Sequence, residues 1–338
     1  MNRLVDGEWR TDYQLTDEGG AFQRGETTFR DWVAGSDVPA HVDAEPDDRF
    51  QPEAGRYHLY VSYACPWAHR TLLARSLLDL EDAIDVSVVD PWRGEDGWQF
   101  TPEKDGCTED KLYGSSFLRE LYVEADPDVT CRVTVPVLWD TEEETIVNNE
   151  SREILRQLTT AFADLGNGAD LAPIDRREEI DRIITEIYEP INNGVYRAGF
   201  ASEQVPYEEA IDELFGALDH WDEQLADRRY LAGDRLTEAD ICMFTTLVRF
   251  DPVYHTHFMC NVRHVHEYEN LWPYLRDVYQ TAGVAETVRM DHIKKHYYTT
   301  HPDVTPSGII GRGPDLEFTA PHGRDELPGR PPEPIAAD

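Results

Sequence analysis

The sequence has few lysines, and few cations of any kind for its length. Only four of its 31 lysine and arginine residues are lysine, against 67 aspartate and glutamate residues, so the 338-residue chain has a formal net charge of −36. A field of that sign repels phosphate backbones and anionic lipids, which argues against nucleic acid and membrane surfaces as partners. We interpret the composition as adaptation to concentrated salt, because salt screens the self-repulsion of so many carboxylates.

The sequence also lacks long apolar runs and paired cysteines. No stretch approaches the roughly 18 consecutive apolar residues of a membrane helix, and the polar start is unlike a secretory signal, so we expect a cytoplasmic protein. The five cysteines are widely spaced and contain no Cys-x-x-Cys pair, which argues against a disulfide framework and a zinc ribbon. With 40% hydrophobic residues, the chain nevertheless has enough apolar surface for a core.

The hydrophobic pattern of the first half alternates between strand and helix. Residues 1–50 are polar with scattered aromatic residues, and we expect an irregular N-terminal arm there. Residues 51–165 open with a strand, a helix and a second strand, the order of a βαβ unit with a parallel strand pair. The predicted strands lie at residues 57–62, 84–89, 133–139 and 145–147. Pro136 falls inside the third strand and cannot donate to the ladder, so that strand is at a sheet edge or the proline has a special role.

The second half is expected to be entirely helical. From Asn149 onward the apolar residues recur with a helical period, and this pattern continues through a predicted domain at residues 172–295. Thr237 and Asp240 have the spacing of a capping box at the start of one of its helices. Residues 296–338 include a tail rich in proline and glycine, for which we expect an extended C-terminal arm. The sequence thus predicts an α/β domain followed by an all-α domain.

Cys65 stands where a predicted strand meets a predicted helix, with Pro66 at the first helical position, where proline is well tolerated. A thiol at that place faces unpaired helix N–H groups and the positive end of the helix dipole, which favours the nucleophilic thiolate. His69 and Arg70 offer further positive charge one turn away. A small buried cysteine is the commoner role of a single cysteine, but the strand–Cys–Pro–helix placement favours the reactive interpretation.

Six segments spread over nearly the whole chain carry longer motifs. They are YACPWAHRT at 63–71, RVTVPVLWD at 132–140, IVNNES at 146–151, NNGVYRAGF at 192–200, RFDPVY at 249–254 and HYY at 296–298. These motifs closely resemble the glutathionyl-hydroquinone reductases, the Xi class of glutathione transferases. The resemblance implies a thioredoxin-like N-terminal domain, an all-helical glutathione-transferase C-terminal domain, a homodimer and no tightly bound cofactor.

The resemblance also implies an activity and assigns Cys65 as its nucleophile. In the family's chemistry the thiolate attacks the sulfur of a glutathionyl-hydroquinone, which releases the hydroquinone and leaves a mixed disulfide on the cysteine. A second thiol, glutathione or γ-glutamylcysteine, then reduces that disulfide. Ala68 occupies the position of the second cysteine of a thioredoxin, so no intramolecular thiol at that spacing can take this step.

Further residues are assigned to thiol binding by the same resemblance. They are Trp98, Arg119, Val135, Glu150 and Ser151. Val135 precedes the family's cis-proline and would pair with the thiol through its backbone, whereas a trans edge-strand proline is the alternative. Glu150 and Ser151 fall at a helix start that can take the γ-glutamyl group, or they form an ordinary solvated first turn. Trp98 would pack on the thiol or belong to a loop core, and Arg119 would contact the glycyl carboxylate or form a surface ion pair.

Three tyrosines match family residues that line the hydroquinone pocket: Tyr196, Tyr254 and Tyr298. A phenol can hydrogen-bond a developing phenolate or donate the proton that the ring carbon gains, and we assign Tyr196 and Tyr298 to catalysis and Tyr254 to substrate binding. Buried tyrosines in helices are otherwise usually core residues. The His-x-His pairs at 255–257 and 264–266 have no carboxylate at a settled spacing, so we expect ordinary histidines and no metal site.

Two other functions remain open from the sequence. A general thiol transferase or dehydroascorbate-type reductase would use the same Cys65 and would not need the tyrosines. A non-catalytic binding module is possible because this two-domain fold also serves protein interaction. Degenerate members of that kind often lose the nucleophile, whereas this sequence keeps Cys65 together with Glu150 and Ser151.

Overall fold

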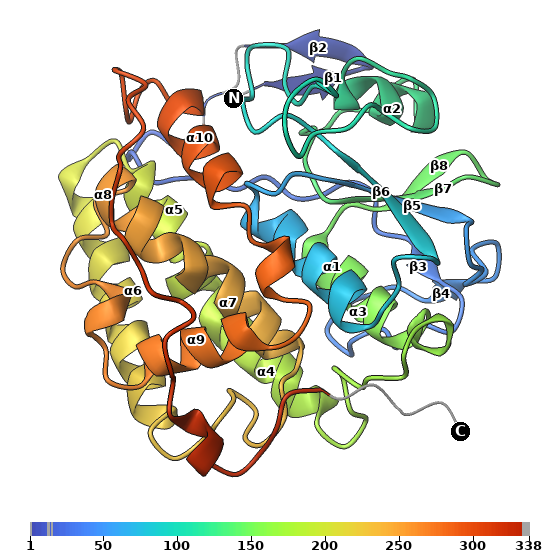
Figure 1. The fold of residues 1–338 in the computed structure, drawn as a ribbon. Coiled ribbons are helices and arrows are strands. Elements are labelled where there is room, and N and C mark those ends of the chain that lie inside the picture. Colours follow the sequence, from blue (N-terminus) through green and yellow to red (C-terminus); the bar gives the residue numbers. More distant parts are fainter. Residues whose placement is uncertain (1, 12–13, 15, 333–338) are drawn as a thin grey trace. The chain divides into compact units, whose positions relative to one another are not determined.

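The chain folds into two compact units, seen in the computed structural model in Figure 1, which describes residues 2–11, 14 and 16–332. Unit 1 contains Met1–Gln14 and Arg24–Ala169, and unit 2 contains Leu15–Gln23 and Asp170–Glu333. A short stretch before Arg24 therefore belongs to the second unit, although most of the N-terminal segment belongs to the first. Among the described residues, no helix has the length and apolarity needed to cross a membrane.

Unit 1 is built on a four-stranded sheet with the order β6-β5-β7-β8. Strands β5 (Tyr57–Val61) and β6 (Ile84–Val88) pair in parallel, and helix α1 (Pro66–Leu77) lies between them in the chain. The predicted βαβ unit is therefore confirmed. Strands β7 (Val137–Asp140) and β8 (Thr145–Asn148) form the predicted antiparallel hairpin. All residues of β5 and β7 are buried, as expected for the two central strands of a covered sheet.

Pro136 does not lie in an edge strand, so the other predicted alternative, a special role for the proline, applies. Strand β7 pairs with β5 on one side and β8 on the other, so it is not an edge strand. The strand begins at Val137, one residue after the proline, and the Val135–Pro136 peptide bond is cis. Pro136 therefore stands outside the ladder, where its missing N–H costs no strand hydrogen bond.

Two further helices complete unit 1. Helix α3 (Ser151–Thr160) follows β8 directly and packs side by side with α1 (Figure 1). Helix α2 (Leu118–Ala125) lies in the long excursion between β6 and β7. Helix α1 begins shortly after the end of β5, and helix α3 begins shortly after the end of β8.

The N-terminal arm is more regular than the sequence predicted. Strands β1 (Arg3–Val5) and β2 (Glu8–Arg10) form an antiparallel hairpin, and β3 (Trp32–Val33) pairs in parallel with β4 (Pro46–Asp47). The hairpin turn is Asp6–Gly7, both with positive φ, which is a common two-residue hairpin sequence. A Cβ on Gly7 would also lie 2.0 Å from the carbonyl oxygen of Pro127, so only glycine fits there.

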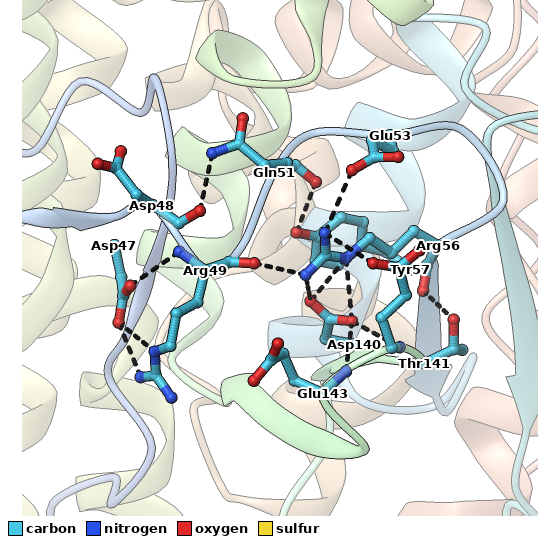
Figure 2. A network of polar contacts seen from close by, with 11 residues as sticks. Asp47, Asp48, Arg49, Gln51, Glu53, Arg56, Tyr57, Asp140, Thr141 and Glu143 are labelled. Carbon is cyan, nitrogen blue, oxygen red and sulfur yellow. Dashed lines mark hydrogen bonds and ion pairs between the residues drawn. The ribbon is translucent and has the colours of Figure 1, made fainter.

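A buried ion pair fastens the start of β5 to the end of β7 (Figure 2). The side chain of Arg56 is 6% exposed and that of Asp140 is 0% exposed. Arg56 donates from Nε and Nη2 to the Asp140 carboxylate at 2.9 and 2.7 Å, and from Nη2 to the carbonyl of Arg49. The backbone N–H groups of Glu142 and Glu143 donate to the same carboxylate. Asp140 thus neutralises a buried cation and also closes the turn of the β7–β8 hairpin.

Unit 2 is helical throughout its described regular elements. Its α-helices are α4 (Arg177–Ile187), α5 (Gly194–Gly199), α6 (Gln204–Gln224), α7 (Glu238–Arg249), α8 (His255–His257), α9 (Leu271–Gln280) and α10 (Met290–Thr300). Two π-helical turns, η2 (Tyr188–Asn192) and η3 (Phe250–Tyr254), follow α4 and α7. The predicted capping box of Thr237 and Asp240 starts α7. After α10 the described tail consists of irregular segments, several hydrogen-bonded turns and the short helical turn Arg324–Glu326.

The buried His58 on β5 predicts acid sensitivity. Its Nε2 lies 2.8 Å from the hydroxyl of Ser87, and burial lowers its pKa from the ordinary 6.5 to about 4. The unfolded chain binds the extra proton between these two pH values, so the free energy of unfolding must fall as the pH drops from about 6.5 to 4. We expect this histidine to account for a loss of about 3 kcal/mol.

Urea denaturation at a series of pH values measures this loss. His58→Gln keeps a polar side chain that can reach Ser87 but removes the titration, and its free energy of unfolding should vary less steeply over that range. An equally steep dependence in the variant would assign the acid sensitivity to other groups.

Candidate active site

Cys65 is the N-cap residue of α1, and Pro66 is the first residue of that helix. The thiol is half-buried, and its Sγ lies 3.6 Å from the carbonyl oxygen of Val135. The structure thus brings together the predicted nucleophile and the residue before the cis-proline. The Cys65 carbonyl accepts the N–H of His69 in the first turn of α1. A negative charge on Sγ would face the positive end of α1.

Glu150 and Ser151 occupy the corresponding place on α3. Glu150 is its N-cap and accepts the backbone N–H of Arg152, while Thr27 of the arm lies 3.3 Å from its other carboxylate oxygen. The hydroxyl of Ser151 lies 3.4 Å from Nη1 of Arg70, which is buried on α1. Arg70 therefore links the helix that carries the thiol to the helix start predicted to take the γ-glutamyl group.

The sequence did not single out Trp67 and Arg24. The indole of Trp67 lies close to two guanidinium groups, Arg70 at 4.4 Å and Arg24 at 4.7 Å from the ring centroid. Two cations therefore lie against the ring of Trp67, two residues after Cys65, in a strongly acidic chain. Trp67 belongs to the YACPWAHRT motif and could have been identified there, but Arg24 is remote in sequence and only the fold brings it to α1.

Trp98 lies buried in its loop and Arg119 forms an ion pair, which are the alternatives to thiol binding that the sequence left open. Trp98 is buried in the excursion, with the guanidinium of Arg93 at 5.3 Å from its ring. Arg119 pairs with the carboxylate of Asp96 at 3.1 Å and lies over the ring of Phe117. Contact with a glycyl carboxylate would require Arg119 to share or give up that ion pair, so its role in thiol binding stays a prediction.

Within unit 2, the tyrosine cluster includes a residue that the sequence analysis missed. The hydroxyl of Tyr297 on α10 lies 2.5 Å from that of Tyr196 on α5 and 3.1 Å from that of Tyr254 in η3. Burial raises the pKa of Tyr254 and Tyr297 well above the ordinary value, so both are protonated near neutral pH. Tyr298 instead donates to the carbonyl of Pro252 at 3.2 Å.

The helical period could have identified Tyr297. Neighbouring residues on a helix point about 100° apart, so Tyr297 and Tyr298 cannot face the same spot. Tyr297 lies four residues after the buried Ile293, whereas Tyr298 lies four residues after Lys294. The apolar partner marks Tyr297 as the tyrosine of the inner face.

The fold brings a carboxylate to the second His-x-His pair, although none lies at a settled spacing in the sequence. Asp251 of η3 accepts the ring Nδ1 of His266 at 2.7 Å and lies 3.5 Å from Nδ1 of His264. The separation of 13 residues between Asp251 and His264 follows no motif spacing, and only the folding of the loop after α8 brings them together.

Comparison with known proteins agrees with both units. Residues 64–161 match the family model for the N-terminal domain of glutathione S-transferases, and residues 204–277 match the model for the C-terminal domain. Glutathionyl-hydroquinone reductase YqjG of Escherichia coli is 49% identical over 327 residues, which cover 96% of this chain and 99% of that protein. The predicted thioredoxin-like domain and all-helical domain are confirmed.

Two solved structures are similar over almost the whole chain. A Xi-class glutathione transferase from the halophile Natrialba magadii is 69% identical, with a TM-score of 0.90 and 98% coverage of both chains. The glutathione-bound structure of YqjG from Escherichia coli has a TM-score of 0.86 and 46% identity, and covers 96% of this chain and 99% of that one. With this similarity over 96% or more of its length, the chain belongs to the Xi class of glutathione transferases, the family of the glutathionyl-hydroquinone reductases.

Proposed function

We propose that the protein is a thiol-dependent reductase that removes glutathione or γ-glutamylcysteine from glutathionyl-hydroquinones. The observation that carries this proposal is the half-buried Cys65 at the N-cap of α1, with its Sγ 3.6 Å from the Val135 carbonyl. That arrangement offers a thiolate beside a backbone edge that can hold a peptide-like thiol. The relatives named glutathionyl-hydroquinone reductase support the substrate class.

The proposed reaction has two steps. The Cys65 thiolate attacks the sulfur of the thioether, the bond between sulfur and the aromatic carbon breaks, and its electron pair stays on that carbon, which takes up a proton. The free hydroquinone leaves, and Cys65 remains in a mixed disulfide with the thiol. A second thiolate then attacks the outer sulfur, which releases a disulfide of two thiols and restores the Cys65 thiolate.

Residues of both helix starts are proposed to hold the thiol. Glu150 would pair with the γ-glutamyl ammonium, and Ser151 with the N–H groups of α3 would take its carboxylate. The backbone of Val135 would pair with the cysteinyl part, and Trp98 would pack against it. Arg119 is the proposed partner of a glycyl carboxylate, a role that falls away if the thiol is γ-glutamylcysteine.

The tyrosine cluster is proposed to serve the aromatic part of the substrate. A buried, protonated phenol can donate a hydrogen bond to the hydroquinone oxygen or a proton to the ring carbon. Tyr196 is the proposed donor and Tyr254 a substrate contact. The hydroxyl of Tyr297 is hydrogen-bonded to the hydroxyls of both tyrosines, which favours Tyr297 as the third tyrosine of the site. Assistance by Tyr298 is the alternative proposal.

Tyr196→Phe should lower kcat for the quinol thioether by about 10²-fold, because the loss of one general acid typically costs that much or more. The same variant should reduce a simple mixed disulfide of glutathione at the normal rate, since breaking an S–S bond protonates no aromatic carbon. Steady-state kinetics on both substrates measure the difference, with Tyr279→Phe on α9 as the control.

Two comparisons complete this test. Tyr297→Phe should reduce thioether turnover more than Tyr298→Phe, because Tyr297 shares a hydrogen bond with Tyr196. Equal losses on thioether and disulfide in Tyr196→Phe would instead support a general thiol transferase.

A homodimer and a cytoplasmic location stay predictions. Sedimentation of the purified protein can test the first of them.

Salt should lower the Michaelis constant for the thiol. Glutathione and γ-glutamylcysteine are anions that must approach a chain with a net charge of −36, which cations such as Arg70, Arg119 and Arg132 offset only locally. Screening weakens the remaining repulsion, so the constant should fall severalfold between low and molar salt. Uncharged 2-mercaptoethanol is the control, and its constant should change little. A constant for glutathione that stays flat or rises while the fold is intact would contradict this prediction.

A further inference from the structure

A second group of chemically active side chains lies in unit 2, apart from the tyrosine cluster. The group consists of Asp251, His264 and His266, whose ligand-type atoms all lie within 4.8 Å of one another. Asp251 is in the π-helical turn η3, and the two histidines flank Val265 at the short turn η4 (Val265–Glu267). The proposed reductase mechanism uses none of them.

Backbone hydrogen bonds hold this group in place. The N–H groups of Val265 and His266 donate to the two carboxylate oxygens of Asp251 at 2.7 and 3.1 Å. The N–H of His264 donates to the carboxylate of Glu267 at 2.8 Å, which fixes the start of the turn. The ring of His255 stacks on His264 with a centroid separation of 3.5 Å. The carboxylate and both imidazoles are therefore oriented by contacts that do not depend on an ion.

One ring nitrogen already has the spacing of a metal ligand from the Asp251 carboxylate. Nδ1 of His264 is shielded from solvent and has no hydrogen-bond partner within the described part of the chain, and it lies 3.5 Å from Oδ1 of Asp251. Zinc bonds of about 2.0 to 2.2 Å in a tetrahedron place two ligands about 3.3 to 3.5 Å apart. Nδ1 of His266 lies 2.7 Å from Oδ2 of the same carboxylate, and a bound ion would replace the hydrogen bond between them.

The donor set and burial indicate which ions fit. Two imidazoles and one carboxylate suit Zn²⁺, Co²⁺ or Ni²⁺, whereas Mg²⁺ and Ca²⁺ prefer oxygen ligands only. Asp251 is 2% exposed and His266 is 39% exposed, so the group is closed on the protein side and open toward solvent. We propose that Asp251, His264 and His266 bind one divalent transition-metal ion, with water in the fourth position.

The position of the site gives the ion a structural effect. Asp251 and Tyr254 lie in the same turn, η3, and the histidines lie in the loop that follows α8. A bound ion would tie that loop to η3 and so stabilise the turn that carries one tyrosine of the cluster. This inference does not depend on the proposed reductase activity, because the ion does not take part in that reaction.

Co²⁺ and Zn²⁺ titrations of the full chain, without an affinity tag and freed of metal by a chelator, test the site. We expect one ion per chain and intense visible Co²⁺ absorption without a thiolate charge-transfer band. Excess Mg²⁺ should not displace the ion. His264→Ala and His266→Ala should each weaken Zn²⁺ binding at least about 30-fold, and His220→Ala, a change of an exposed histidine on α6, should not.

Three results would overturn the site. They are absence of Co²⁺ and Zn²⁺ binding to the unaltered chain, wild-type affinity in both cluster variants, and a thiolate band that puts the ion on a cysteine. Circular dichroism of each variant establishes that the fold is kept. Since His266 is the most exposed ligand, His266→Ala gives a folded variant even if His264→Ala disturbs the turn.

Discussion

Replacing Cys65 with serine should abolish the removal of glutathione from a glutathionyl-hydroquinone, with kcat/KM lower by about 10³-fold or more. Serine keeps the size of the side chain at the N-cap of α1, but its hydroxyl is not ionised near neutral pH and cannot form the mixed disulfide. The rate of hydroquinone release, measured by chromatography at equal protein concentration, gives the effect directly.

Cys107→Ser is the matched control for this change. Cys107 is the other half-buried thiol, with its Sγ 3.9 Å from the carbonyl of Val89, and its loss should leave turnover unchanged. The buried Cys131 and Cys260 cannot substitute for Cys65, because burial raises the pKa of Cys131 to about 12 and raises that of Cys260 as well. A Cys65→Ser variant that kept a tenth of the activity would rule out covalent catalysis by this residue.

The second large effect concerns stability. Asp140→Ala should lower the free energy of unfolding of unit 1 by about 3 kcal/mol, because the buried guanidinium of Arg56 then keeps only the exposed carboxylates of Glu53 and Glu142. Arginine is protonated at any ordinary pH even without Asp140, so the cation cannot lose its charge to escape the penalty. The variant also loses the acceptor for two backbone N–H groups of the hairpin turn. Urea denaturation in molar salt measures the loss.

A surface pair provides the comparison for this stability effect. Arg182 and Glu186 form an exposed pair on α4 at 2.6 Å, and Glu186→Ala should cost less than about 1 kcal/mol. Replacing Arg56 and Asp140 together by leucine should recover part of the loss, since no buried charge then remains. If Asp140→Ala were no more destabilising than Glu186→Ala, the buried pair would not hold the sheet together as argued.

Elements that depend on local pattern could be predicted from the sequence. The strand, helix and strand after residue 56, the hairpin that ends at Asn148 and the capping box at Thr237 all have short-range signals, and the structure has each of them. The placement of Cys65 at the N-cap of α1 follows from the same signals, because Pro66 marks the first helical position. The resemblance to a family added residues that no spacing alone would have indicated.

Features that depend on long-range contact could not be predicted. Neither Arg24 beside Trp67 nor Asp251 between His264 and His266 follows a spacing that a sequence displays. The isomer of the Val135–Pro136 bond likewise depends on the surrounding fold and not on the dipeptide. Tyr297 is a different case, because the period of α10 carried a signal for its place in the hydrogen-bonded cluster, whereas the resemblance assigned a role to its neighbour Tyr298, which stays a prediction.

The most direct test of the proposed mechanism is the intact mass of the protein after one turnover without free thiol. One equivalent of a glutathionyl-hydroquinone should release one hydroquinone per chain and add one glutathione to Cys65 as a disulfide, which added thiol then removes. Stoichiometric hydroquinone release with no adduct on the chain, or with the adduct on another cysteine, would contradict nucleophilic attack by Cys65.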